Sequence, residues 1–362
     1  MLWIVWQIQA GFSPWEIGRK AFALIPSCFV DLNIEILPVY DRPDDVPRTR
    51  RKARRRQQRR PNKNKYQQCE AHIAHSSTSR LEGAKALQHH PAMTEKTIVV
   101  TGAGAGIGKA TALELARRGA RVVVGARSEA SAAPVVDAIN KAGGKAEALA
   151  MDLSSGESIK SGVARFLESH DRVDVLINNA GVWAGERKLT PEGHEITWSV
   201  NVLAPFRLTQ LLSDALHKGE GRVINLSSSQ HYKGDIHWDD LQLQSNYNAQ
   251  RAYAQSKLAV TMLSIEHADR DERLKVNAAH PGVAGTDLFR NFPGFIRFWI
   301  NLLMSTPEKC ARPAVMLASD PACSDVTGKF YYKLNQREPH ALVKDAEARK
   351  RLWELVATQA GV

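Results

Sequence analysis

The chain has 362 residues, of which 43% are hydrophobic and 24% are charged, and both values are ordinary for a soluble globular protein. This length allows one large domain or two average ones, and the composition excludes a collagen-like, a fully disordered or a multi-spanning membrane protein. The four cysteines have no close pairing, so they form neither a zinc pattern nor a disulfide framework, and a reducing, cytoplasmic location fits best.

The net charge of +11 is concentrated at the start of the chain. Residues 1–92 contain 16 basic and 8 acidic residues, a net charge of +8, whereas the remaining 270 residues carry only +3. The basic character of the chain therefore says little about the partners of residues 93–362, for which no nucleic-acid partner is expected.

The N-terminal extension, residues 1–92, differs from the rest in composition. Charged residues interrupt its apolar stretch, so no run approaches the roughly 18 residues of a membrane span, and the pattern of a secretory signal is absent. Residues 48–65 form a basic tract, and we expect residues 41–92 to be disordered because they cannot bury enough apolar surface. The tract is either a solvated tail or a segment for nuclear targeting, nucleic-acid binding or contact with an anionic membrane. Since Met93 stands just before the first predicted strand, we favour an over-extended start over a targeting role.

From residue 97 onward, apolar strands alternate with helical stretches. Their hydrophobicity is continuous, which suits strands buried on both faces of a parallel sheet. The alternation predicts a doubly wound, parallel α/β sheet flanked by helices, in a single domain that spans residues 93–362. The predicted strands are residues 97–101, 121–125, 145–151, 173–178, 221–227, 274–280 and 328–332.

A glycine-rich turn follows the first predicted strand and runs into a helix. Glycines allow a tight turn and bring backbone N–H groups close to a pyrophosphate, and the helix N-terminus adds a partial positive charge. Such a turn alone is weak evidence, but between a strand and a helix it indicates a dinucleotide site. The residues concerned are Gly102, Gly104, Gly106, Ile107 and Gly108.

The end of the second predicted strand bears on which dinucleotide is bound. An NAD site normally offers an acidic residue here, but this chain has Arg127 and no carboxylate before Glu129. Arg127 could pair with the 2′-phosphate of NADP or be a surface arginine, and the missing acid favours NADP(H) over NAD(H). Asp152 and Leu153 stand where an adenine contact is expected, although Asp152 could simply cap the next helix.

Tyr253 and Lys257 are four residues apart, so on a helix they share one face. A lysine ammonium near a phenol favours the phenolate and lowers the phenol's pKa from about 10, which would make Tyr253 a general acid or base. An exposed amphipathic helix would show the same spacing.

The order of these motifs resembles that of the short-chain dehydrogenase/reductase family. The resemblance rests on the TGxxxGxG pattern of Thr101–Gly108, on NNAG at 178–181 and on YAQSK at 253–257, and it covers residues 97 to about 335. Any one motif is weak, and the assignment depends on their order and separation. The resemblance implies a Rossmann-type fold and an NAD(P)-dependent alcohol dehydrogenase or carbonyl reductase.

The resemblance also gives roles to single residues beside Tyr253. Ser228, the second of three consecutive serines, would hydrogen-bond the substrate oxygen and stabilise its developing charge. Lys257 would also hold the nicotinamide ribose, and Asn201 would hold a water in the proton relay. The further cofactor-binding positions that it implies are Asn178, Ala180, Gly181, Pro281 and Gly282.

The separation of 25 residues between Ser228 and Tyr253 is about twice that of many family members, and the longer spacer resembles the retinol-dehydrogenase-like branch. This insert could loop out between strand and helix. After Gly282 the chain resembles the family's mobile substrate lid, whose aromatic residues would line an apolar pocket, pack on the core or bury a subunit contact of a homo-oligomer. A lipophilic alcohol or carbonyl is therefore favoured as the substrate. The aromatic residues are Phe289, Phe292, Phe295, Phe298 and Trp299.

The alternative function is a non-catalytic binding or regulatory protein on the same fold, with the basic extension contacting nucleic acid or membrane. The complete set of four catalytic candidates favours the enzyme, because a non-catalytic protein need not keep all of them. We expect the remaining cysteines and histidines that stand near these motifs to be structural or surface residues, namely Cys310, Cys323, His231 and His237.

Overall fold

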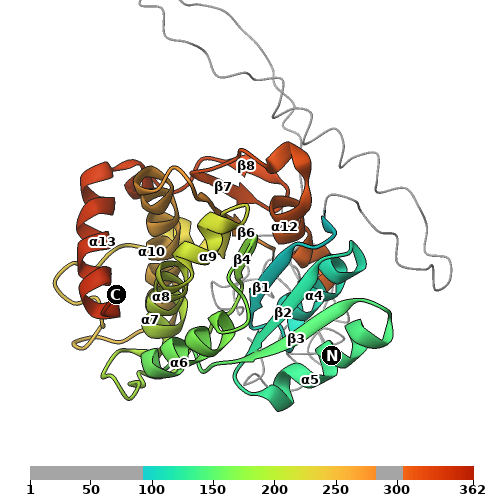
Figure 1. Ribbon diagram of the computed structural model, residues 1–362. Coiled ribbons are helices and arrows are strands. Elements are labelled where there is room, and N and C mark those ends of the chain that lie inside the picture. Colours follow the sequence, from blue (N-terminus) through green and yellow to red (C-terminus); the bar gives the residue numbers. More distant parts are fainter. Residues whose placement is uncertain (1–92, 283–304) are drawn as a thin grey trace, which may run out of the picture. The chain divides into compact units, whose positions relative to one another are not determined.

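The computed structural model describes residues 93–282 and 305–362, which belong to one α/β unit (Figure 1). The expectations for the N-terminal extension before Met93, and those for the aromatic residues between 289 and 299, lie outside the described residues. All four catalytic candidates lie within them.

A sheet of eight strands lies at the centre of this unit, in the order β3-β2-β1-β4-β5-β6-β7-β8. Neighbouring strands are parallel from β3 to β7, and β8 is antiparallel to β7. The strand order reverses between β1 and β4, which is where doubly wound sheets bind their ligands. The strands are β1 (Thr97–Thr101), β2 (Arg121–Ala126), β3 (Lys145–Ala150), β4 (Val175–Asn178), β5 (Arg222–Leu226), β6 (Lys275–His280), β7 (Lys329–Tyr332) and β8 (Asn335–Arg337).

The predicted Rossmann-type sheet is confirmed, with each of the seven predicted strands ending within two residues of its expected bounds. The antiparallel strand β8 was not predicted. All three of its residues are exposed, so the sequence shows no apolar pattern there, and the strand forms a short hairpin with β7 at the edge of the sheet.

The continuous hydrophobicity of the central strands follows from their burial on both faces. In β1 the side chains of Ile98 and Val100 pack into one core, whereas Val99 packs into another. Because successive side chains of a strand point to opposite faces, a strand covered on both sides must be apolar at every position.

Helices cover the two faces of the sheet in separate groups (Figure 1). One core includes residues of α4, α5 and α12, and the opposite face is covered by α6, α8 and α10, with α13 packed against α10. The helices are α4 (Gly106–Arg117), α5 (Glu129–Lys141), α6 (Gly156–Leu167), α7 (Ile196–Trp198), α8 (Ala204–Leu211), α9 (Ser213–Lys218), α10 (Ala249–Arg270), α12 (Pro307–Ser319) and α13 (Ala346–Ala360). Short turns of other helical types are η4 (Ser199–Leu203), η5 (Ser229–Lys233), η7 (Pro321–Cys323) and η8 (Ala341–Lys344).

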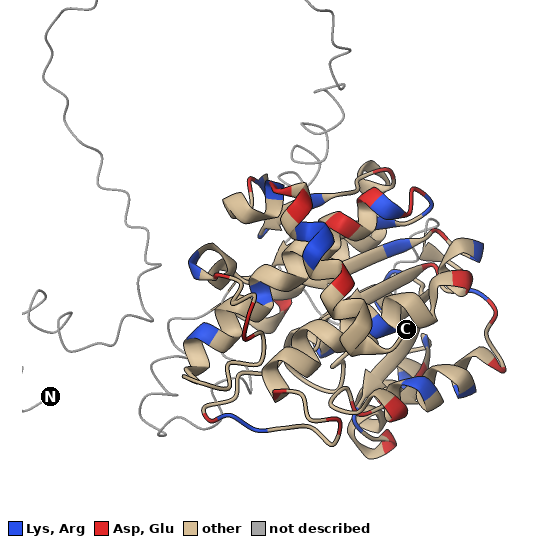
Figure 2. Ribbon diagram, turned by 90° about the vertical axis from the view of Figure 1, so that its left-hand side faces the viewer, with Lys and Arg blue, Asp and Glu red and all other residues tan. Residues whose placement is uncertain are grey.

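The surface of the described part mixes both signs of charge. In the ribbon of Figure 2 the positions of basic and acidic residues are interspersed along its helices and loops. Within the ranges that the structure describes, no helix is both long enough and apolar enough to cross a membrane.

Candidate active site

A cavity of about 500 Å³ lies at the carboxyl ends of the parallel strands, where the strand order reverses. Its wall is formed largely by residues that directly follow β1 to β6, together with the start of α4 and two side chains of α10. The structure brings together twelve residues predicted for the site on this wall: Gly102, Gly106, Ile107, Gly108, Arg127, Asp152, Leu153, Ala180, Gly181, Tyr253, Lys257 and Pro281.

Three residues predicted to bind the cofactor do not line the cavity. Gly104 packs against the start of α5, where a side chain would collide with the carbonyl oxygen of Ser131. Asn178 lies inside the sheet, and its Nδ2 donates to Oδ1 of Asn225 at 2.8 Å. Gly282 has a positive φ of 99° and lies next to the cavity residue Pro281.

The glycine-rich turn presents main-chain groups to the cavity. The residue before α4, Ala105, provides no side-chain cap, and the first turn of the helix holds no acidic residue. The unpaired N–H groups and the positive end of the helix dipole are therefore available to an anion. A side chain at Gly108 would collide with the carbonyl oxygen of Gly102, so only glycine permits this close packing.

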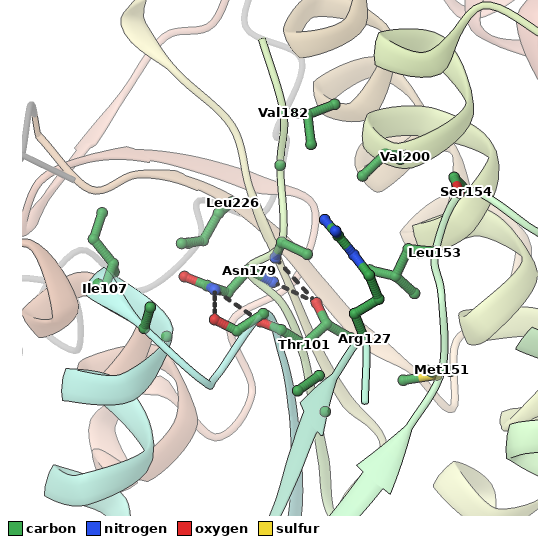
Figure 3. A pocket seen from close by; sticks show the side chains of 18 of the residues that line it. Thr101, Ile107, Arg127, Met151, Leu153, Ser154, Asn179, Val182, Val200 and Leu226 are labelled. Carbon is green, nitrogen blue, oxygen red and sulfur yellow. Dashed lines mark hydrogen bonds between the residues drawn. The ribbon is translucent and has the colours of Figure 1, made fainter. Parts of the chain in front are cut away.

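Thr101 and Asn179 join the turn to the end of β4 (Figure 3). The Thr101 hydroxyl oxygen accepts from the backbone N–H groups of Asn179 and Ala180, at 3.0 and 3.1 Å. In return, Nδ2 of Asn179 donates to the Thr101 carbonyl oxygen at 2.7 Å. Neither residue was in the predicted site, although Asn179 stands inside the NNAG motif and Thr101 opens the TGxxxGxG motif.

Arg127 is exposed at the end of β2, and its side chain points into the cavity (Figure 3). The next residue, Ser128, caps α5 by accepting from the N–H of Ser131 at 3.3 Å. Asp152 lies on the same wall, but its Oδ1 accepts from both the N–H and the hydroxyl of Ser154, at 2.9 and 2.8 Å. Its carboxylate therefore stabilises its own loop, whereas the guanidinium of Arg127 faces the cavity.

Helix α10 places Tyr253 and Lys257 on the other side of the cavity. Both are buried, with 9% and 4% of their surface exposed. The Lys257 ammonium donates to the carbonyl oxygen of Leu226 at 2.8 Å and lies 5.6 Å from the centre of the Tyr253 ring. A carbonyl at the end of β5 thus holds the ammonium beside the phenol.

The expectation that Lys257 lowers the pKa of Tyr253 is wrong in this structure. Burial raises the pKa of Tyr253 to about 12, although hydrogen bonding by Ser228 acts in the opposite direction. Burial also lowers the pKa of Lys257 to about 8. Desolvation of the phenolate is the largest cause of the raised pKa of Tyr253, and the ammonium that was expected to oppose it is bound to the Leu226 carbonyl oxygen. At neutral pH Tyr253 therefore carries its proton, and Lys257 is mostly charged.

Ser227 and Ser228, two of the three consecutive serines, make different contacts. The Ser227 hydroxyl is turned to α10, where it donates to the Lys257 carbonyl oxygen at 3.1 Å and pairs with the Thr261 hydroxyl at 2.7 Å. Ser228 instead hydrogen-bonds the Tyr253 side chain, and its Oγ also accepts from the N–H of Gln230 at 3.2 Å. Of the two, Ser228 is the serine beside the phenol.

A buried histidine holds the backbone at Ser228. Nδ1 of His231 lies 2.7 Å from the Ser228 carbonyl oxygen, and its Nε2 accepts from the N–H of His340 at 3.3 Å. Burial lowers the pKa of His231 to about 4, so the ring is neutral and Nδ1 carries the proton. His231 is thus a structural residue, and the cysteines Cys310 and Cys323 are buried as well.

Asn201 lies in the π-helical turn η4, behind the cavity wall. Its Oδ1 accepts from the N–H of Val182 at 2.8 Å, and its Nδ2 donates to the Val182 carbonyl oxygen and to the Ser256 hydroxyl, both at 3.0 Å. The amide therefore fixes the segment after β4 against α10. Its role in holding a relay water stays a prediction.

Known proteins resemble this chain in sequence and in fold. Residues 96–294 match the family described as short chain dehydrogenase. The chain is 40% identical to human retinol dehydrogenase 13 over 287 residues, which cover 74% of this chain and 85% of that protein.

Solved structures extend the comparison to bound dinucleotides. A short chain dehydrogenase from Burkholderia cenocepacia in complex with NADP has a TM-score of 0.55 at 25% identity, covering 67% of this chain and 97% of that chain. A 7α-hydroxysteroid dehydrogenase complexed with NADH has a TM-score of 0.54 at 28% identity, covering 70% of this chain and 96% of that chain. Proteins of this fold thus occur with either dinucleotide.

Proposed function

The chain belongs to the short-chain dehydrogenase/reductase family and is an oxidoreductase, and from this premise we propose that it uses NADP(H) to interconvert a lipophilic alcohol and its carbonyl compound. The observation that carries the proposal is the meeting, at one cavity, of an uncapped helix N-terminus with the Tyr253 and Lys257 side chains, with Ser228 hydrogen-bonded to Tyr253.

The residues present fit a nicotinamide dinucleotide. The bare first turn of α4 and the close packing at Gly108 leave room and N–H groups for a pyrophosphate. The preference for NADP(H) rests on Arg127, whose guanidinium faces the cavity at the strand end where an NAD site carries an acid. Because solved relatives hold either dinucleotide, this choice depends on the residues of this chain.

The catalytic side chains act on the oxygen of the second substrate. Bound NADP(H) supplies or accepts the hydride. Tyr253, protonated at neutral pH because of its raised pKa, donates its proton to a carbonyl oxygen, and the Ser228 hydroxyl hydrogen-bonds the same oxygen. The Lys257 ammonium stabilises the negative charge that Tyr253 acquires as the proton leaves. In the reverse direction the phenolate would accept the proton of the alcohol.

A lipophilic substrate is supported by sequence similarity. The relative with 40% identity is named for its action on retinol, an apolar alcohol, and the similarity extends over 85% of that protein. We take from it only the class of compound, an alcohol or carbonyl with a largely apolar skeleton.

An Arg127→Asp variant tests the choice of dinucleotide. Loss of one charge-assisted contact of about 1.5–3 kcal/mol should change the ratio of kcat/KM for NADPH over NADH by roughly ten- to a hundredfold. Arg121→Asp is the matched control, since Arg121 is exposed at the opposite end of the same strand. If the wild-type enzyme had the same kcat/KM for NADH as for NADPH, Arg127 would not select the cofactor.

A further inference from the structure

Trp183 lies against the ring of the proton donor, and no sequence motif pointed to it. Its indole stacks on the Tyr253 ring, with the ring centres 5.0 Å apart and the planes inclined by 17°. The indole is half-buried, so part of its surface remains accessible.

The backbone on both sides of Trp183 is fixed by side chains from other elements. Asn201 binds the N–H and the carbonyl oxygen of Val182, at 2.8 and 3.0 Å. On the other side, the Tyr247 hydroxyl donates to the carbonyl oxygen of Ala184 at 2.8 Å. Groups from η4 and from the long spacer before α10 therefore fix the backbone that carries the indole, and the indole itself stacks on Tyr253.

Tyr247 is itself firmly placed. Its hydroxyl lies 3.3 Å from Oε1 of Glu195, a buried carboxylate that also accepts from the N–H groups of Thr197 and Trp198, at 2.9 and 2.8 Å. Since Tyr247 belongs to the spacer between Ser228 and Tyr253, this spacer has a structural role. It anchors the segment that presents Trp183 to the phenol.

A fixed indole beside the phenol constrains the substrate. A carbonyl oxygen that takes the proton must reach the hydroxyl at the end of the Tyr253 ring, so the group bonded to the carbonyl carbon comes within reach of the indole. Aromatic surfaces pack best against flat groups in offset or edge-on arrangements. A saturated ring of the same carbon count is thicker and gains less from this surface.

We propose that Trp183 is a specificity-determining residue of the substrate site, which favours carbonyl compounds attached to a flat, conjugated group over saturated compounds of similar size. This inference rests on the proposed function for the reaction itself.

The test compares benzaldehyde with cyclohexanecarbaldehyde, which have the same number of carbons but differ in flatness. In the full chain, Trp183→Leu should lower kcat/KM for benzaldehyde about tenfold relative to cyclohexanecarbaldehyde, mainly through KM. Trp183→Phe, which keeps an aromatic ring, should retain most of the preference. Taking the ratio between variants removes the intrinsic difference in reactivity of the two aldehydes.

Equal losses with both aldehydes in Trp183→Leu would overturn the proposal, because they would mean that Trp183 only positions Tyr253. A kcat/KM that is unchanged for both aldehydes would overturn it as well. Thermal unfolding of each variant shows whether the chain is folded, and Trp183→Met, which also lacks an aromatic ring, takes the place of the Leu variant if that one is not.

Binding without turnover separates this inference from the proposed function. Ligand-observed saturation-transfer NMR measures how strongly each aldehyde binds to wild type and to Trp183→Leu. Stronger binding of benzaldehyde that is lost in Trp183→Leu supports the inference even in an enzyme that does not reduce it. Absence of any such difference contradicts the inference, whether or not the enzyme turns over.

Discussion

The dinucleotide side of the cavity is built from main chain, whereas its catalytic side is built from buried side chains. On the first side, Gly102 and Gly108 pack backbone against backbone ahead of an uncapped helix. On the second side, the buried residues Ser228, Tyr253 and Lys257 come from two segments: Ser228 hydrogen-bonds Tyr253, and the Leu226 carbonyl oxygen holds the Lys257 ammonium. The two sides therefore respond to different changes.

The difference shows what controls each half of the site. A main-chain site depends on close packing, so a single methyl group is enough to damage it. A site of buried side chains depends on desolvation, which moves the pKa of Tyr253 up and that of Lys257 down. Substitutions should thus separate cofactor binding from proton transfer.

The largest expected effect is on proton transfer. Tyr253→Phe removes the hydroxyl but keeps the ring that stacks on Trp183. We expect kcat to fall by roughly 10²–10⁴-fold, the usual contribution of a positioned general acid. The dissociation constant for NADPH, measured by fluorescence titration, should change little.

Tyr232→Phe is the matched control for this loss. The Tyr232 hydroxyl donates to the Glu338 carbonyl oxygen at 2.7 Å, and the side chain is 40% exposed. Its removal should leave turnover unchanged. Full activity in Tyr253→Phe would contradict the assignment of the proton donor.

Acidification should lower the stability of the fold through three buried histidines. Burial lowers the pKa of His231 and His267 to about 4 and that of His280 to about 3. Since an unfolded histidine takes up its proton at about 6.5, the unfolded state binds more protons below that pH, and stability falls on acidification. A single histidine moved from 6.5 to about 4 accounts for roughly 3 kcal/mol by pH 4.

Urea unfolding at pH 7 and at pH 5 measures this effect. The free energy of unfolding should be lower at pH 5, and the effect should be smaller in a His267→Gln variant, because that variant removes one of the three groups. Equal stability at both pH values would show that the histidines are not buried as neutral rings.

Packing at the dinucleotide side predicts a smaller loss. The added methyl group in Gly108→Ala would meet the Gly102 carbonyl oxygen and the Asn179 amide. We expect a loss of about 1–3 kcal/mol in stability and weaker NADPH binding, while the residues around Tyr253 stay in place. Gly185→Ala is the control, since no atom lies within 4 Å of the added group. Identical NADPH affinity in both variants would contradict the close packing.

The smallest effect is expected from removing the N-terminal extension. We predict that a chain starting at Met93 keeps its thermal stability and specific activity, because the described site and its cores lie within residues 93–282 and 305–362. Met93 itself is buried in the core under α4 and α12. A marked drop in melting temperature or activity would show that residues 1–92 contribute to the working enzyme.

The sequence predicts the dinucleotide side better than the catalytic side. The glycines of the turn stand within eight residues of one another, so their pattern is visible in one short stretch. A strand such as β1 can be predicted from its apolar run. By contrast, Trp183 is 70 residues from Tyr253 in the sequence, and only the folded chain brings the two rings together. The sequence also does not show that Asn178 points into the sheet whereas Asn179 lines the cavity.

The direction of the Tyr253 pKa was also beyond the sequence. Spacing places Lys257 on the same helix face, but spacing does not show how deeply the phenol is buried or that the ammonium is held by the Leu226 carbonyl. Desolvation depends on the whole surrounding structure, including the indole of Trp183, and it reverses the expected shift.

Transfer of isotope measures the central claim most directly. Two samples of NADPH are prepared, each with deuterium on one of the two faces of C4 of the nicotinamide. Wild-type enzyme is incubated with benzaldehyde and each sample in turn, and the alcohol is analysed by mass spectrometry. The account predicts one deuterium per molecule of alcohol from one of the two labelled cofactors, and almost none when Tyr253→Phe is used for the same time. The account would be contradicted if the enzyme bound NADPH but formed no deuterated alcohol from any carbonyl compound in an apolar series.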